Sequence, residues 1–88
     1  MKMKDLVKKL FEEKKDFYCY LEAAEMETDS EKKAMYLKLA ESEGDHYKAL
    51  HGIIFADENR SEREEGFYEV TKECYQEMVE EIKKHLSK

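Results

Sequence analysis

The chain contains no proline and only three glycines among its 88 residues, so very little in it interrupts a helix. Charged residues make up 43% of the sequence, a composition typical of long solvated helices. Two short polar segments break the pattern, at residues 28–30 and 57–61. The sequence therefore predicts an all-α chain, residues 1–88 forming a single domain, with helices at about 4–27, 30–57 and 62–86.

The first break, Thr28-Asp29-Ser30, is only about three residues long. A connection this short forces two successive helices to run antiparallel as a hairpin. Its side chains favour a helix start because they can accept hydrogen bonds from free backbone N–H groups. Ser61, followed three residues later by Glu64, marks the start of the third helix in the same way. We therefore expect an antiparallel helical hairpin plus a third helix.

The negative net charge of the chain limits the classes of molecule that it is expected to bind. The formal net charge is −6, which disfavours nucleic acid and anionic membrane surfaces because neither offers counter-charge to an acidic protein. No apolar run approaches the length of a membrane span, and the N-terminus leads into a charged segment with no apolar signal core. We expect a cytoplasmic protein that binds neither nucleic acid nor membrane.

Helical periodicity sorts the apolar residues into one stripe on each helix. The stripe of the first helix contains Leu6, Leu10, Phe17, Leu21 and Ala24. That of the second contains Met35, Tyr36, Leu39, Ala40, Tyr47, Leu50, Ile53 and Ile54, and that of the third contains Phe67, Thr71, Cys74, Met78, Ile82 and Leu86. These residues are expected to face the interior, whereas His51 lies off its stripe and is expected at the surface.

Glu43 falls near the centre of the second stripe, and His46 follows three residues later on the same face. A carboxylate on an apolar face is costly unless it is paired or bound to a cation. Glu13 lies in the first stripe, about 15 residues from the middle of the break, as does Glu43, so the hairpin brings them to one height. Glu22 would lie about 13 Å from that height, and Glu12 points to the opposite side. The pattern predicts a metal site formed by Glu13, Glu43 and His46.

Each of these predictions has a plainer alternative. Glu43 and His46 could belong to a buried polar network, or to a stripe that faces solvent. Glu13 could form an ordinary ion pair with Lys9, four residues earlier on the same helix.

Residues 11–54 resemble the first helical pair of rubrerythrin and related ferritin-like proteins. Glu13 with Tyr20 seven residues later is similar to their first-helix pattern, and Leu39-Ala40 before Glu43 and His46 is similar to their second. The resemblance implies that Glu13, Glu43 and His46 are iron ligands. It also implies that Tyr20 lies near the metals, where it could have a catalytic role.

The chain departs from this family in carrying one hairpin where full-length members carry two, and in lacking a rubredoxin-type Cys-x-x-Cys module. The one-hairpin layout is similar to encapsulated ferritins, which complete their site between two subunits. Two copies would supply four carboxylates and two imidazoles, the ligand set of a di-iron four-helix bundle. We expect a homodimer or higher homo-oligomer, with the third helix outside the four-helix core or exchanged onto the partner.

The expected function is that of a ferritin-like di-iron protein, which oxidises ferrous iron with dioxygen or peroxide as a ferroxidase or peroxidase. Manganese or zinc could occupy the same oxygen and nitrogen donors. The alternative is a non-catalytic helical dimerisation or protein-interaction module. Abundant tyrosine and methionine on a small charged scaffold favour that alternative.

Overall fold

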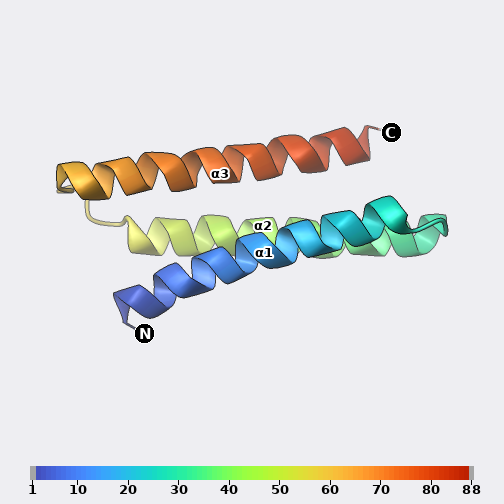
Figure 1. The fold of residues 1–88 in the computed structure, drawn as a ribbon, viewed down its shortest axis with the longest axis horizontal. Coiled ribbons are helices and arrows are strands. Elements are labelled where there is room, and N and C mark those ends of the chain that lie inside the picture. Colours follow the sequence, from blue (N-terminus) through green and yellow to red (C-terminus); the bar gives the residue numbers. More distant parts are fainter. Residues whose placement is uncertain (1, 88) are drawn as a thin grey trace.

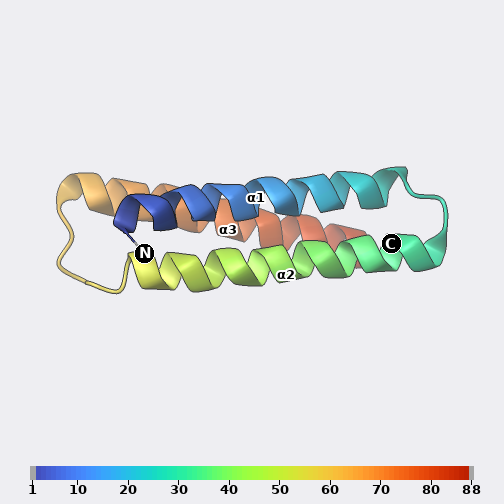
Figure 2. The ribbon, with the colours of Figure 1, turned by 90° about the horizontal axis from the view of Figure 1, so that it is seen from below.

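The structure, a computed structural model, describes residues 2–87 and contains helices α1 (Met3–Met26), α2 (Ser30–Ile54) and α3 (Glu62–Leu86). α1 and α2 form the expected antiparallel hairpin and lie side by side for most of their length (Figure 2). α3 runs along the hairpin as a third, more separate rod (Figure 1). The arrangement is elongated, with principal extents of 47 × 25 × 15 Å. Within the described residues, no helix is both long and apolar enough to cross a membrane.

The starts of α2 and α3 are set by side-chain caps, Asp29 from the expected segment 28–30 and Ser61. Asp29 accepts hydrogen bonds from the backbone N–H groups of Glu31 and Lys32, at 2.9 and 3.3 Å. The hydroxyl of Ser61 accepts from the N–H of Glu64 at 3.2 Å and donates to its carboxylate at 3.1 Å. These contacts satisfy donors that a helix start would otherwise leave free.

The end of α2 differs from the prediction, because the helix stops at Ile54 and not at residue 57. Beyond it, the guanidinium of Arg60 donates to the backbone carbonyls of Phe55 and Asp57, at 3.3 and 3.2 Å. These carbonyls are therefore satisfied without a further helical turn. The guanidinium also lies over the ring of Tyr68, with its carbon 4.1 Å from the ring centroid, which fixes the turn into α3.

The core of the molecule lies mainly between α1 and α2. It consists of the buried residues Leu10, Phe17, Leu21 and Ala24 of α1, Leu37, Ala40 and Tyr47 of α2, and Met78 of α3. On α1 and α2 these residues lie three, four or seven residues apart, as expected for helices that bury one face each.

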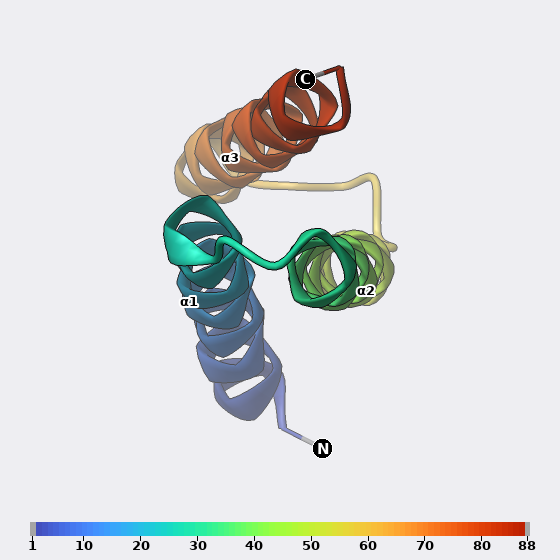
Figure 3. The ribbon, with the colours of Figure 1, turned by 90° about the vertical axis from the view of Figure 1, so that its right-hand side faces the viewer.

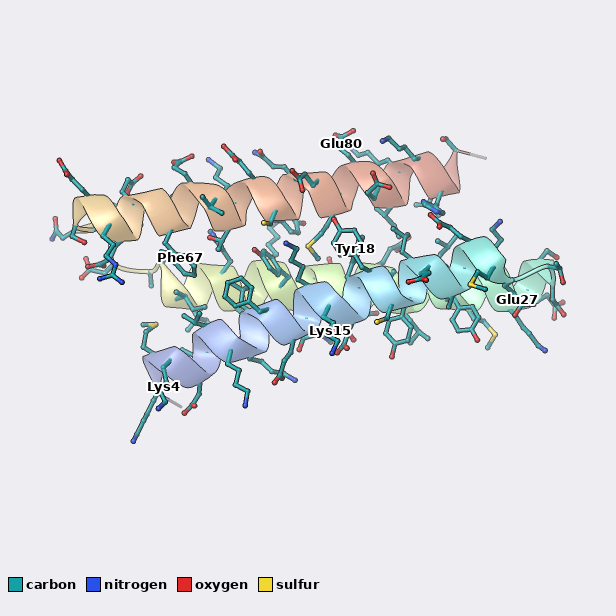
Figure 4. All side chains as sticks on the ribbon, viewed as in Figure 1. Lys4, Lys15, Tyr18, Glu27, Phe67 and Glu80 are labelled. Atoms are coloured by element: carbon teal, nitrogen blue, oxygen red, sulfur yellow. The ribbon has the colours of Figure 1, made fainter. Side chains whose placement is uncertain are left out.

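α3 packs more loosely on the hairpin than α1 packs on α2. Its buried residues are Thr71 and Met78, and the buried hydroxyl of Tyr47 donates to the backbone carbonyl of Thr71 at 2.8 Å. Burial raises the pKa of Tyr47, so this hydroxyl keeps its proton and remains a donor. In Figure 4, Tyr18 of α1 points toward α3, whereas Glu80 points away from the hairpin.

Three residues expected in the buried stripe of α2 are instead exposed. Met35, Leu39 and Ile53 have exposed fractions of 64%, 44% and 58%. Viewed along the helices, α3 lies on one side of the hairpin, and no described segment covers the opposite side (Figure 3). Leu86, expected to face inward on the third helix, is also exposed.

Candidate metal centre

Glu13 of α1 and Glu43 and His46 of α2 converge where the two helices meet. One ligand atom from each residue lies within 4.8 Å of the other two. The Nδ1 atom of His46 is 3.5 Å from Oε2 of Glu13 and 3.7 Å from Oε2 of Glu43. Donors bound to one ion at ~2.1 Å can be about 4.2 Å apart, so small side-chain movements would close this group around an ion. The three residues form a candidate metal site.

The register of the hairpin selects Glu13 from the neighbouring acidic residues of α1. Glu13 is buried at 5% exposure, whereas the side chains of Glu12 and Glu22 are exposed. The i,i+3 spacing of Glu43 and His46 then places both groups on the same side of α2, one turn apart. The choice of Glu13 over Glu12 and Glu22, made from face and height, agrees with this geometry.

A buried carboxylate oxygen of Glu43 shows whether a cation fits at this site. This atom, Oε2, is buried and has no hydrogen-bond partner among residues 2–87. The 3.7 Å separation from His46 is too long for a hydrogen bond. A buried carboxylate oxygen without a partner is costly, and a bound cation would supply what it lacks. Two carboxylates and an imidazole are also a donor set that divalent transition metals accept.

Lys9 is a second cationic group at this site. Its Nζ atom lies 3.4 Å from Oε1 of Glu13 and 3.8 Å from Oε2 of Glu12. The ion pair anticipated as the alternative for Glu13 is therefore present beside the cluster. The two oxygens of Glu13 face different groups, because Oε1 faces Lys9 and Oε2 faces His46.

The cluster opens on the side of the hairpin that α3 leaves uncovered. A cavity between the hairpin and α3 is lined by Phe17, Gly44 and Met78, so this side of α2 faces α3. His46 follows Gly44 by two residues and points about 200° around the helix from it. Its side chain is 59% exposed, and its Nε2 atom has no hydrogen-bond partner within the described chain. Metal-binding histidines usually donate from the second ring nitrogen to an acceptor, which residues 2–87 do not provide.

Tyr20 lies apart from the three candidate ligands. It is half-buried against the core and follows Glu13 by seven residues, or about 10.5 Å along the helix axis. No hydrogen bond in the described part of the chain joins it to Glu13, Glu43 or His46. Its catalytic role stays a prediction.

His51 was expected at the surface but is half-buried between α2 and α3. Its Nε2 atom lies 2.8 Å from the hydroxyl of Thr71, which itself donates to the carbonyl of Phe67, so the ring nitrogen is the donor. Burial lowers the pKa of His51, a hydrogen bond with the backbone of Tyr68 acts in the opposite direction, and the positive charges of Arg60 and Lys72 lower it further. His51 therefore fastens α3 to the hairpin as a neutral ring. Its spacing of four residues from Tyr47 is the signal that could have placed it on this face.

α3 contributes no ligand to the cluster in the described residues, in keeping with its lack of a Glu-x-x-His motif. Its C-terminal histidine, His85, lies 3.0 Å from the carboxylate of Glu25 on α1 and 2.8 Å from the carbonyl of Glu81. These contacts tie the end of α3 to α1. α3 packs on its own hairpin, on the side away from His46.

Comparison with protein-family models, with curated proteins and with solved structures finds no significant match for this chain. The resemblance to ferritin-like proteins therefore stays an expectation drawn from the sequence. The chain is a three-helix all-α protein in which an antiparallel hairpin carries a candidate Glu-Glu-His metal site.

Proposed function

We propose that two copies of the chain pair through the uncovered side of the α1–α2 hairpin and bind two iron ions between them. Glu13, Glu43 and His46 of each copy would be the ligands. The observation that carries this proposal is the convergence of these three donors around a buried carboxylate oxygen that lacks a partner. Two such half-sites supply the carboxylates and imidazoles that a di-iron bundle uses.

The surface around His46 supports pairing through this side. Met35, Leu39 and Ile53 are exposed and lie on one line along α2 with His46, at intervals of four, seven and seven residues. We call these four residues the outer stripe. Apolar side chains at this spacing favour packing against a second helix. A twofold axis near His46 would bring two outer stripes together and cover the exposed imidazoles.

The proposed reaction takes ferrous iron as its substrate. Bound iron supplies one-electron chemistry toward dioxygen or peroxide. With peroxide, two ferrous ions give up one electron each, the O–O bond breaks, two protons are taken up, and two waters leave. Glu13 and Glu43 would favour the ferric product, because two negative charges stabilise the more highly charged ion. Leu39 and Ile53, covered by the partner copy, would limit access of water to the site.

The ligand atoms of the site limit which metal ions it could bind. Carboxylate oxygens and an imidazole nitrogen suit iron and manganese, and zinc accepts the same donors without redox chemistry. Iron is proposed because the resemblance of Glu13, Glu43 and His46 to ferritin-like patterns points to it.

A non-catalytic dimerisation module is the second candidate, and exposure of the outer stripe favours it independently of any metal. In that case, chelators would change neither the mass nor the melting temperature of the protein. In the metal-binding case, both would depend on the metal.

Anaerobic titration of metal-free protein with ferrous iron tests the proposal. We expect binding to saturate at about one iron per chain and ferric absorbance to develop when air or peroxide is admitted. Glu43→Ala should abolish both, whereas Glu41→Ala, which removes an exposed carboxylate of the same helix, should change neither. Absence of binding, or equal binding by Glu43→Ala, would contradict the proposal.

A further inference from the structure

Lys9 already places a positive charge on one of the candidate ligands. Its Nζ atom lies 3.4 Å from Oε1 of Glu13, a side chain that is almost completely buried. A buried carboxylate is costly without a compensating charge, and Lys9, although about half exposed, supplies one to Glu13. His46 compensates Glu13 only when its ring is protonated, so Lys9 is the permanent cation of the metal-free cluster.

We infer that Lys9 is a counter-cation of Glu13 that competes with a divalent cation for this carboxylate, so that it lowers the metal affinity of the site. This inference rests on the proposed function, since it concerns the same three ligands. Lys9 is a positioning residue and not a ligand, because an ammonium group has no lone pair to offer a metal.

Two effects oppose Lys9 and a metal ion at the same carboxylate. The ammonium charge would lie within a few ångströms of a divalent ion and repel it. Lys9 also faces Oε1 of Glu13, so only Oε2, on the side of His46, is directed into the cluster. Binding of a metal through both oxygens of Glu13 therefore requires Lys9 to move.

Glu12 offers the displaced ammonium group another partner. Its Oε2 atom is 3.8 Å from Nζ of Lys9, and both side chains are about half exposed. Lys9 can therefore exchange Glu13 for Glu12 and water through side-chain rotation, without movement of the backbone. The two neighbouring carboxylates of α1 therefore have different roles. Glu13 faces the metal cluster, and Glu12 pairs with Lys9 once it has left Glu13.

Calorimetric titration with Mn²⁺ tests this inference without redox chemistry. We expect Lys9→Met to bind Mn²⁺ about tenfold more tightly than the wild type, equivalent to about 1.4 kcal/mol. Lys9→Arg should resemble the wild type because it keeps the competing charge. Lys15→Met, which removes a lysine from an exposed position of the same helix (Figure 4), controls for net charge and should also bind like the wild type.

The stability of the same variants supplies a second readout. Metal-free Lys9→Met should melt below the wild type, whereas the saturated proteins should unfold with equal free energies, because Lys9 no longer contacts Glu13. Glu12→Gln, a change at an exposed position, should bind Mn²⁺ more weakly because the released lysine loses its alternative partner.

The possible results distinguish a failure of the role of Lys9 from a failure of the metal site itself. Binding by the wild type with equal or weaker binding by Lys9→Met would overturn the role of Lys9 alone. If neither protein binds Mn²⁺ or ferrous iron, the metal site and the inference fall together. Tighter binding by both Lys9→Met and Lys15→Met would assign the effect to net charge and would also overturn the role of Lys9.

Discussion

Oε2 of Glu43 is the only buried side-chain oxygen or nitrogen without a hydrogen-bond partner among residues 2–87. Such an atom lowers the stability of the metal-free fold, because it has lost its hydration without gaining a hydrogen bond. Glu13 avoids this state through Lys9 and His46. At the scale of single residues, a cation bound at Glu43 would therefore stabilise the fold more than one bound at Glu13.

Glu43→Leu should raise the unfolding free energy of the metal-free protein by about 1–3 kcal/mol, since it removes an unpartnered buried oxygen. Thermal melts in the presence of a chelator would measure the change. Glu41→Leu, at an exposed position, provides the control and should stay within about 0.5 kcal/mol of the wild type. With saturating metal the order should reverse, because only the wild type gains binding energy. A metal-free Glu43→Leu protein less stable than the wild type would contradict this account of the site.

The sequence alone could identify Glu13, because face and height in the hairpin both exclude Glu12 and Glu22. It could not place His51 correctly, although it did offer the Lys9–Glu13 ion pair as an alternative. The predicted stripe of α2 included Met35 and other outward-facing residues, which shifted its centre away from α3 and made His51 look peripheral. Periodicity also cannot show whether Lys9 pairs with Glu12, with Glu13 or, as the structure has it, with both.

At the scale of helices, the hairpin and α3 differ in how they are held. α1 and α2 share most of the core, whereas α3 is fastened by a few specific contacts at intervals along its length. The capping residues that begin α2 and α3 were predictable from local chemistry. The end of α2 was not, because it depends on Arg60, which returns from the following turn to satisfy two carbonyls.

His51 makes the docking of α3 sensitive to acid. Burial lowers its pKa in the folded protein, so the unfolded chain takes up the proton first as the pH falls. The stability that neutral His51 contributes is therefore complete above the ordinary histidine pKa of about 6.5 and is lost as the pH falls below it.

His51→Gln should reduce this dependence, because glutamine can donate to Thr71 but does not titrate in this range. Melting temperatures measured between pH 7.5 and 5.5 should fall less in the variant than in the wild type. His46 and His85 are common to both proteins, so the difference between the two curves isolates His51. Parallel curves would show that α3 docking does not depend on its protonation.

At the scale of the whole molecule, no described part of the same chain covers the apolar side chains of the outer stripe. Sequence periodicity placed Met35, Leu39 and Ile53 on an apolar stripe, but it could not say whether their neighbour is the same chain or another one. The structure answers half of that question, since α3 covers the other side of the hairpin. Pairing of two outer stripes is the proposal that accounts for both the exposed apolar side chains and the exposed imidazole.

Light scattering coupled to size-exclusion chromatography, with iron counted in the eluted peak, tests the central claim most directly. We expect anaerobically iron-loaded protein to elute at twice the 10.6 kDa mass of one chain and to carry about one iron per chain. Leu39→Glu, which puts a charge in the outer stripe, should lower both the dimer fraction and the iron content. Iron retained by a particle of 10.6 kDa, or a dimer that excludes iron, would contradict the shared site.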